Sequence, residues 1–321
     1  MPDVSIIGSG PAARACDDLL GRTGFEVRRA FEVDETERNP AIVGETAGAY
    51  AIARQLIGAG RHVLIASPLS LSASQLLALL AARSPKQALF LWSERRFHPG
   101  YRFIGGLAEA DPVTWQPRFI RQTSLLIEAA SAIAIRWRTL ESIALSLKLT
   151  QAAPESVIAA AAESEQRNAP DFLSLNLQTD KGPAFIQVGM GESSARQETT
   201  LAVAYRKAYI DELNESVPIR ITDGSETAVA GSSRWVSCPS PAPEELTRQQ
   251  CLAFLEATER ATLAEAEAAL WARSLAVLHA ADASLSEDGA AVDVQDQDQP
   301  GFRVILGQQP RQRSAGRMLP A

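Results

Sequence analysis

A glycine-rich turn near the start of the chain carries the clearest chemical signal. Gly8, Gly10 and Ala13 follow the apolar residues 4–7 and open the helical stretch 14–20. In such a strand–turn–helix unit the first glycine permits a tight turn and the second lets the backbone approach a pyrophosphate. The third small residue lets helix and strand pack closely, and the helix N-terminus faces the phosphates. The spacing predicts a dinucleotide site; a tight turn without a ligand is the alternative.

Charged residues near the second predicted strand bear on the same nucleotide. Glu32 and Asp34 come about 20 residues after the turn, where an acid hydrogen-bonds the adenosine ribose. Arg28 and Arg29 could instead accept a 2′-phosphate. The sequence therefore leaves both NAD and NADP open, and a solvated loop charge is the alternative for either acid.

Short apolar runs alternate with amphipathic stretches over residues 1–94, which predicts a parallel sheet. We expect strands at 4–7, 25–30, 41–43, 61–66 and 87–92, and helices at 14–20, 49–56 and 72–82.

The pattern changes after about residue 94. We expect a helix at 124–146, a helix or connecting turn at 154–162, strands at 171–178, 184–190, 199–204, 208–211 and 217–221, and two helices within 244–283. Alternating apolar and polar residues in 172–177 indicate an antiparallel sheet with one wet face. The chain is thus predicted to be α/β, with a dinucleotide-binding domain (1–94), an α+β domain (95–294) with an open, mostly antiparallel sheet and the C-terminal helices, and a largely mobile tail (295–321).

Composition narrows the class of protein. The chain has 321 residues and a net charge of −7, which argues against nucleic acid or an anionic membrane surface as partner. Its three cysteines show no metal-ligand spacing and form a poor disulfide framework. No apolar run is long enough to span a membrane, and no basic-then-apolar leader opens the chain. We expect a cytoplasmic protein without a metal site.

Residues 53–68 add a second signal. Ala59-Gly60-Arg61-His62-Val63 leads into an apolar run that ends in Ala66-Ser67-Pro68, and Arg95-Arg96-Phe97-His98-Pro99 follows the last strand of the first domain. In order and spacing these segments resemble the Gfo/Idh/MocA oxidoreductases, the glucose–fructose oxidoreductase and inositol dehydrogenase family. The resemblance covers most of residues 4–294. It implies a Rossmann domain, a second domain whose open sheet lines the substrate site and often builds oligomers, and hydride transfer between a nicotinamide and a hydroxyl-bearing carbon. By this resemblance Gly8, Gly10, Ala13, Glu32 and Pro68 belong to the cofactor site.

The chain departs from the family pattern at three places. The catalytic Lys of the family maps to Ser67, whose hydroxyl cannot supply the same acid–base work unaided. A family His falls near Ala132, although Glu128 matches an upstream acid. The nucleotide domain is shortened, since residues 31–40 replace about 30 further residues in full-length members, so we expect a smaller sheet and a weakened or absent dinucleotide site.

The remaining polar residues have competing interpretations. The candidates for acid–base catalysis are Ser67, His98, Tyr101 and Glu128, and a structural role is the alternative for His98. Arg95 and Arg96 could clamp an anionic small-molecule substrate, or make ion pairs between the domains.

Two functions follow from these residues. The first is a degenerate family member, a pseudoenzyme that serves as a regulatory or scaffold subunit of a homo- or hetero-oligomer assembled through the sheet of its second domain. The second is an active NAD(P)-dependent oxidoreductase with a rewired acid–base group acting on a small polar substrate. A non-redox binding protein remains as a third. Binding of a dinucleotide distinguishes the first two functions, because an active reductase must hold one and a scaffold need not. The fold alone does not set the function.

Overall fold

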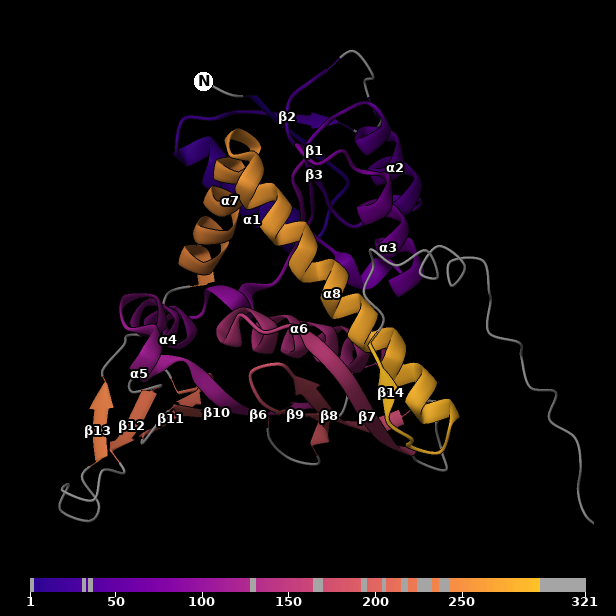
Figure 1. The fold of residues 1–321 in the computed structure, drawn as a ribbon. Coiled ribbons are helices and arrows are strands. Elements are labelled where there is room, and N and C mark those ends of the chain that lie inside the picture. The colour runs from indigo at the N-terminus through magenta and orange to yellow at the C-terminus, as the bar shows by residue number, and fades with distance from the viewer. Residues whose placement is uncertain are drawn as a thin grey trace, which may run out of the picture.

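The structure, a computed structural model, describes residues 3–30, 33, 37–127, 131–163, 170–191, 195–203, 206–214, 219–223, 233–236 and 243–294. The described elements build two β-sheets, one above the other in Figure 1, with helices packed between and around them. The first sheet is parallel and the second is mostly antiparallel, as the sequence predicts. Glu32, Glu128 and the tail 295–321 lie outside the described residues, and so do the predictions made for them.

Among the described residues, five short parallel strands make the first sheet. They are β1 (Asp3–Ile7), β2 (Glu26–Ala30), β3 (Ala41–Val43), β4 (Val63–Ile65) and β5 (Leu89–Leu91). Their order is β2-β1-β3-β4-β5. Every residue of β3, β4 and β5 is buried, which is typical of a parallel sheet covered on both faces.

Helices cover the two faces of this sheet. They are α1 (Pro11–Arg22), α2 (Ala49–Gly58), α3 (Ala73–Ala82) and α7 (Pro243–Glu259). Successive strand residues point to opposite faces, so Leu64 packs in one cluster with Cys16 of α1 and Phe254 of α7. Its neighbour Ile65 packs in the other, with residues of α2 and α3. A helix from the C-terminal part of the chain thus completes the first sheet, and a domain boundary at residue 94 stays a prediction.

The connection from β2 to β3 is short. β2 is an edge strand of the described sheet, and residues 31–40 carry the chain to β3, on the other side of β1. Relative to the 3-2-1-4-5-6 order of a doubly wound sheet, the described order lacks the outer strand beside β2. The fully buried Arg61 holds the end of this connection, donating to the Asn39 carbonyl at 2.8 Å and the Ser5 hydroxyl at 2.7 Å.

The second sheet has the order β13-β12-β11-β10-β6-β9-β8-β7-β14 in the described part of the chain. Its strands are β6 (Pro117–Ile127), β7 (Pro154–Glu163), β8 (Pro170–Thr179), β9 (Ala184–Gly191), β10 (Arg196–Val203), β11 (Arg206–Asp211), β12 (Ile219–Asp223), β13 (Ser233–Val236) and β14 (Val292–Asp293). β6 and β9 are parallel, and the other neighbouring pairs are antiparallel.

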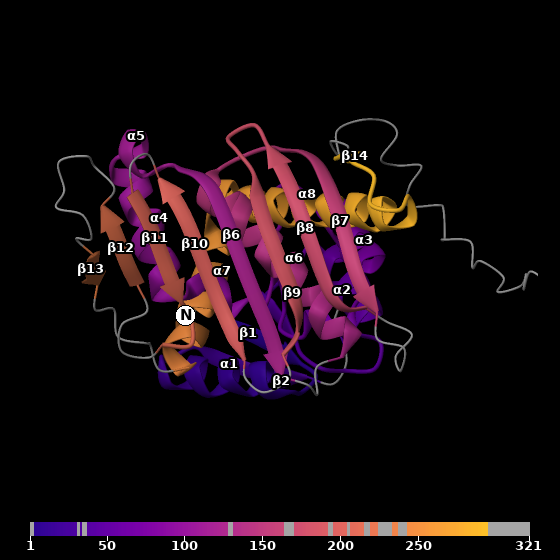
Figure 2. The ribbon, with the colours of Figure 1, turned by 90° about the horizontal axis from the view of Figure 1, so that it is seen from below.

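Two long helices cover one face of this sheet, α6 (Ala132–Thr150) and α8 (Ala261–Ser286). No described helix crosses the opposite face, which is seen in full in Figure 2. None of the described helices is long and apolar enough to cross a membrane.

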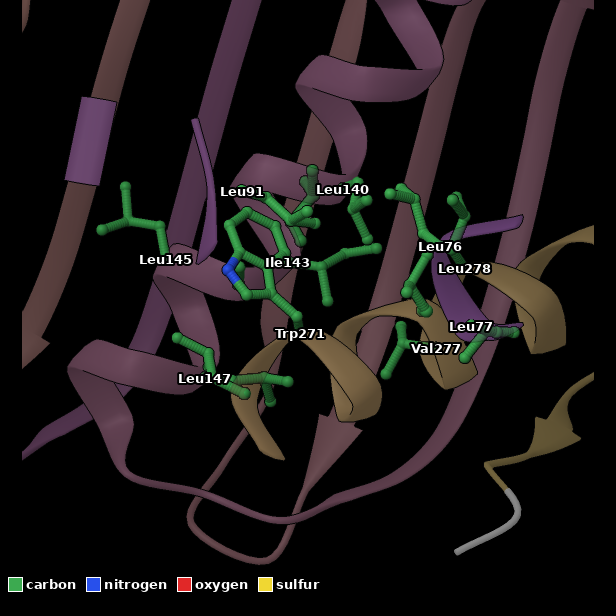
Figure 3. Close-up of a cluster of buried hydrophobic side chains, with 14 of the residues drawn as sticks. Leu76, Leu77, Leu91, Leu140, Ile143, Leu145, Leu147, Trp271, Val277 and Leu278 are labelled. Carbon is green, nitrogen blue, oxygen red and sulfur yellow. The ribbon is translucent and has the colours of Figure 1, made fainter. Parts of the chain in front are cut away.

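One apolar core joins the two sheets. Trp271, in the middle of α8, is fully buried and packs in one cluster with Ile143 of α6, Leu76 of α3 and Leu91 of β5 (Figure 3). Trp271 also stacks on Trp137 of α6, with ring centroids 5.6 Å apart. The same cluster includes Ile186 of β9, so the two sheets share a hydrophobic core.

Two predicted helical segments are wrong. Residues 154–162, expected as a helix or turn, lie in β7, where Val157 and Ala159 face the core and pairing with β8 overrides the helical propensity of the alanines. Residues 124–127, expected as helix, end β6, and α6 begins at Ala132. The buried face of β6 carries Gln122 and Ser124. Because these buried residues are polar, the sequence of β6 does not alternate between apolar and polar residues as a half-buried strand usually does.

Candidate functional site

The carboxyl ends of the parallel strands meet at one edge of the first sheet, where ligands of doubly wound folds bind. The glycine turn follows β1, Gly44 and Glu45 follow β3, and Ser67 follows β4. The short helices after β4 and β5 are η1 (Pro68–Ser70) and η2 (Glu94–Phe97), and both contact α6. This carboxyl edge therefore lies against the helix that covers the second sheet.

The glycine turn has the backbone that the motif predicts. Gly8 and Gly10 have φ values of 92° and 101°, which side chains other than glycine rarely adopt. Ala13 is buried, and a Cβ on Gly44 would lie 2.7 Å from the Ala13 Cβ. Small residues at both positions thus let α1 approach the end of β3.

Glu45 pairs with Ser9 in this turn and lies beside Gly10. The Ser9 N–H donates to the Glu45 carbonyl at 3.0 Å, and the Glu45 N–H donates to the Ser9 carbonyl at 2.7 Å. The Glu45 side chain bends over Gly10, where an added Cβ would lie 2.9 Å from its Cδ and 3.1 Å from its Oε1. A carboxylate therefore lies against the glycine that lets backbone approach a pyrophosphate, and its charge opposes a phosphate.

Ser67 lies at the carboxyl edge, as its place after β4 predicts. The side chain is half-buried, and the backbone carbonyl accepts from the Ser70 N–H at 3.1 Å and the Ser70 hydroxyl at 2.7 Å. Pro68 is buried and begins η1. No hydrogen bond joins the Ser67 hydroxyl to a described side chain that could act as its base.

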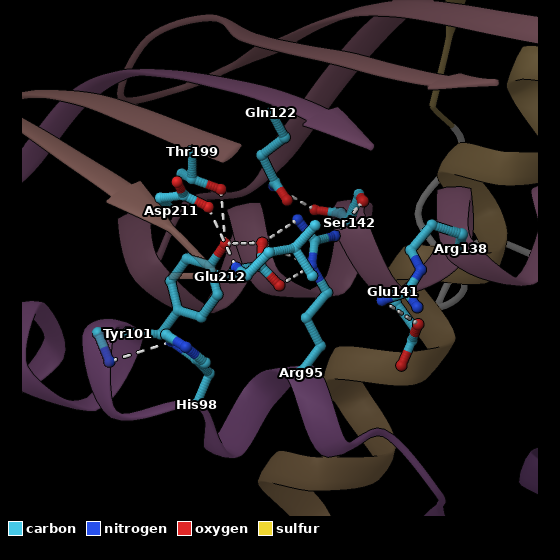
Figure 4. Close-up of polar contacts among 12 residues, drawn as sticks. Arg95, His98, Tyr101, Gln122, Arg138, Glu141, Ser142, Thr199, Asp211 and Glu212 are labelled. Atoms are coloured by element: carbon cyan, nitrogen blue, oxygen red, sulfur yellow. Dashed lines mark hydrogen bonds and ion pairs between the residues drawn. The ribbon is translucent and has the colours of Figure 1, made fainter. Parts of the chain in front are cut away.

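Arg95 lies in a buried network at the crossover between the sheets (Figure 4). Its Nε lies 2.7 Å from Oε2 of Glu212, and its Nη2 lies 2.7 Å from Oε1. Tyr101, on α4 (Pro99–Ala110), donates to Glu212 and lies 2.6 Å from the Thr199 hydroxyl. The network joins η2, α4, β10 and the turn after β11, so the arginine is already held by a carboxylate of the chain.

The ionisation of this network follows from its burial. Burial alone raises the pKa of a carboxyl, but the charge and hydrogen bonds of Arg95 and the bond from Tyr101 bring the pKa of Glu212 below its ordinary value. Burial and the Glu212 charge raise the pKa of Tyr101 well above its usual range. Tyr101 is therefore a neutral donor to Glu212, and a proton does not leave it near neutral pH.

Arg96 is held in the same way by another carboxylate. Its Nη2 lies 2.6 Å from Oε2 of Glu267 on α8, and its guanidinium lies 5.1 Å from the ring centroid of Trp271. Trp271 Nε1 donates to Glu267 at 2.7 Å. Arg95 and Arg96 thus make ion pairs with carboxylates of the chain, which was the alternative to binding an anionic substrate.

His98 begins α4. Its Nδ1 accepts from the Gly100 N–H at 3.2 Å, so the ring is a helix cap and the proton of the neutral form resides on Nε2. Nε2 is buried and has no partner among the described residues. Burial lowers the pKa of His98, and the positive charge of Arg95 also lowers this pKa, against the opposing effect of Glu212.

The predicted site residues thus fall into separate groups. Gly8, Gly10, Ala13, Ser67 and Pro68 lie at the carboxyl edge, and Arg95 and Tyr101 meet at Glu212. Sequence reasoning missed the carboxylates that hold these residues: Glu45, Glu212 and Glu267. No group of three His, Cys, Asp or Glu side chains that could hold a metal occurs in the part of the chain that the structure describes.

Comparison with known proteins supports the fold. No protein-family model and no curated protein matches the sequence. A solved UDP-N-acetylglucosamine 3-dehydrogenase from Acidithiobacillus ferrooxidans is 18% identical with a TM-score of 0.69, over 88% of this chain and 98% of that one. An oxidoreductase from Sinorhizobium meliloti is 12% identical with a TM-score of 0.72, over 91% and 99%. Levoglucosan dehydrogenase in complex with NADH is 12% identical with a TM-score of 0.68, over 92% and 99%. This chain has the two-domain fold of these enzymes.

Proposed function

We propose that the chain is a degenerate Gfo/Idh/MocA protein, a non-catalytic subunit that keeps the two-domain fold and does not carry out hydride transfer. Its role is regulatory or structural, in an oligomer assembled through the second sheet. The similar structures include dehydrogenases, one of them in complex with NADH, and an active enzyme on this fold must hold such a dinucleotide.

The position of Glu45 is the observation that carries this proposal. Its carboxyl group lies against Gly10, and its backbone pairs with both the N–H and the carbonyl of Ser9. A pyrophosphate at the start of α1 would meet a like charge at this position. This carboxylate lies beside the start of α1, where doubly wound folds bind a phosphate, and this supports the proposal.

The groups available for proton transfer support the same conclusion. Ser67 stands where the resemblance places a catalytic Lys. Tyr101 and Arg95 are committed to the buried Glu212, and His98 is committed to capping α4. Tyr101, Arg95 and His98 thus each have a structural partner in the described part of the chain, which supports a structural role over proton transfer.

The bare face of the second sheet supports assembly (Figure 2). Apolar side chains on this face include Phe185 and Ile158, which remain 37% and 43% exposed. Phe185 pairs with Phe119 across β9 and β6, with ring centroids 5.6 Å apart. Aromatic residues on an uncovered surface favour a protein interface over solvent.

The test is a calorimetric titration with NAD(H) and NADP(H), run on the natural chain and on Glu45→Ala. We expect no binding to the natural chain up to about millimolar dinucleotide, and weak binding to Glu45→Ala because the repelling carboxylate is gone. Asp18→Ala, an acid on the far part of α1, is the matched control for a change in net charge.

Micromolar binding to the natural chain would contradict the proposal. It would favour the alternative, an active NAD(P)-dependent oxidoreductase acting on a small polar substrate, and Ser67→Ala would then be assayed for loss of turnover.

A further inference from the structure

Two cysteines far apart in the sequence meet in the apolar cluster on one face of the first sheet. Cys16 lies on α1 and Cys251 on α7, and their sulfur atoms are 3.2 Å apart. Both residues are almost fully buried, at 0% and 1% exposure. The Cys251 thiol donates a hydrogen bond to the Cys16 sulfur, so the two side chains already point at each other.

We propose that Cys16 and Cys251 are a redox-convertible pair, and that their oxidation to a disulfide staples α7 to α1. A disulfide holds its sulfurs about 2.05 Å apart, so the pair has to close by roughly 1 Å. Two helices packed side by side on one face of a sheet can supply that movement by small side-chain rotations and a slight shift of α7.

The reaction balances as thiol–disulfide exchange with a small-molecule disulfide. One protein thiolate attacks the oxidant, forms a mixed disulfide and releases one reduced thiol. The second protein thiolate then attacks the mixed disulfide, forms the Cys16–Cys251 bond and releases the second reduced thiol. Two protein S–H bonds are lost, two protons pass to the released thiolates, and the oxidant is reduced by two electrons.

Burial sets the conditions for this exchange. Neither sulfur is exposed, and the hydrogen bond from Cys251 together with burial raises the pKa of the Cys16 thiol. A buried thiol is slow to react, so exchange requires α7 to lift from α1. The same burial protects the bond once it has formed.

The bridge would act on the carboxyl edge. Gln250, next to Cys251, accepts from the Ser93 N–H at 3.2 Å and donates to the Leu91 carbonyl at 3.1 Å. α1 begins at the glycine turn. A bond between Cys16 and Cys251 would therefore tie α1, which follows β1, and the end of β5 to the same helix.

The test is an oxidation of the full chain with oxidised glutathione in mild urea, which permits local opening, followed by removal of urea and alkylation with N-ethylmaleimide in denaturant. The reduced chain takes up three labels, one on each cysteine. We expect Cys16 and Cys251 to take up no label in the oxidised chain and peptide mapping to find them joined, whereas Cys238 keeps its label or carries a glutathione. The thermal midpoint should rise by about 5 °C or more, because the bond closes a very long loop, and dithiothreitol should reverse the rise.

Cys238→Ala is the matched control and should show the same bridge and the same rise. Cys16→Ala and Cys251→Ala should abolish both. Three free thiols after oxidation, a bridge that includes Cys238, or a Cys16–Cys251 bridge without a rise in midpoint would overturn the proposal. Labelling, peptide mapping and melting of the natural chain decide between these outcomes, so the result does not depend on the folding of a variant.

Discussion

Glu212 holds Arg95 through both carboxylate oxygens, although 117 positions separate the two residues in the sequence. Their side chains are only 4% and 2% exposed. The pair links the crossover after the first sheet to the turn that ends β11. Breaking a buried ion pair from one side leaves an uncompensated charge, so this contact controls the junction of the two sheets.

Glu212→Gln should therefore destabilise the chain strongly. We expect the free energy of unfolding to fall by about 3–5 kcal/mol, because Arg95 loses its counter-charge inside the protein. Urea unfolding followed by circular dichroism measures the change. Glu245→Gln is the matched control, since the Glu245–Arg248 pair is exposed and its loss should change little. A Glu212→Gln chain as stable as the control would contradict this reading of the network.

The same pair predicts a loss of stability in acid. The pKa of Glu212 is lower in the folded chain than its ordinary value, so its contribution is complete above the unfolded pKa of about 4.3. The contribution is lost as the pH falls from there towards the folded pKa. Unfolding curves between about pH 5 and pH 3 should show a smaller drop in Glu212→Gln than in the natural chain. Equal drops would show that other groups control the acid sensitivity.

His98 should make the protein sensitive to a milder fall in pH. Its pKa is lowered in the folded chain, so the unfolded chain binds the proton more readily. The neutral ring contributes fully above the unfolded pKa of about 6.5, and the contribution is lost as the pH falls below it. His98→Asn keeps a side chain that can cap α4 and removes the titration. The difference in unfolding free energy between about pH 7.5 and pH 5.5 should be smaller in this variant than in the natural chain. An unchanged difference would assign the effect to another group. One such group is His62, because burial also lowers its pKa.

Gly44 should tolerate no side chain. A Cβ there would lie 2.2 Å from the Ser9 carbonyl oxygen and 2.7 Å from the Ala13 Cβ. Gly44→Ala should lower the free energy of unfolding by about 1–3 kcal/mol, the usual effect of overpacking. Gly58→Ala, where an added Cβ meets nothing within 4 Å, is the matched control and should be close to neutral. Similar melting midpoints for the two variants would show that the turn gives way easily.

Phe185 tests assembly through the second sheet. Phe185→Arg places a charge in the middle of the bare face and should shift the protein towards smaller species in analytical ultracentrifugation. Val113→Arg is the control, because Val113 is 85% exposed and lies on the short helix α5 (Pro112–Trp115), not on a strand of this face. An oligomer that survives Phe185→Arg unchanged would place the interface elsewhere.

The sequence predicts those parts of this fold that depend on local patterns. The run at 41–43 becomes β3 with the predicted bounds, and the glycine turn takes the backbone its spacing requires. Local pattern fails at β7, because alanines favour helix until a partner strand is present. It fails at β6 because the strand buries Gln122 under α6, where its amide donates to the Ser142 carbonyl.

The site was predicted less completely, for a related reason. The residues that resemble a family motif could be placed at the edge of the sheet, but their partners come from distant positions. Glu212 lies in an ordinary polar turn, and Glu267 on an alanine-rich helix. Nothing in their immediate sequence distinguishes them from other acids. The available signal was that two adjacent arginines at a buried crossover each require a carboxylate.

The length of helix α8 bears on how the two sheets could move relative to each other. At 26 residues it is about 39 Å long, and its contacts extend from α3 at the first sheet to β7 of the second (Figure 1). A hinge between the two sheets would have to bend this rod or pull Trp271 out of the shared core. Helix α8 and the shared core therefore oppose a hinge between the two sheets. If the proposed partner binds the bare sheet face, such rigidity would reduce the binding free energy spent on ordering the molecule.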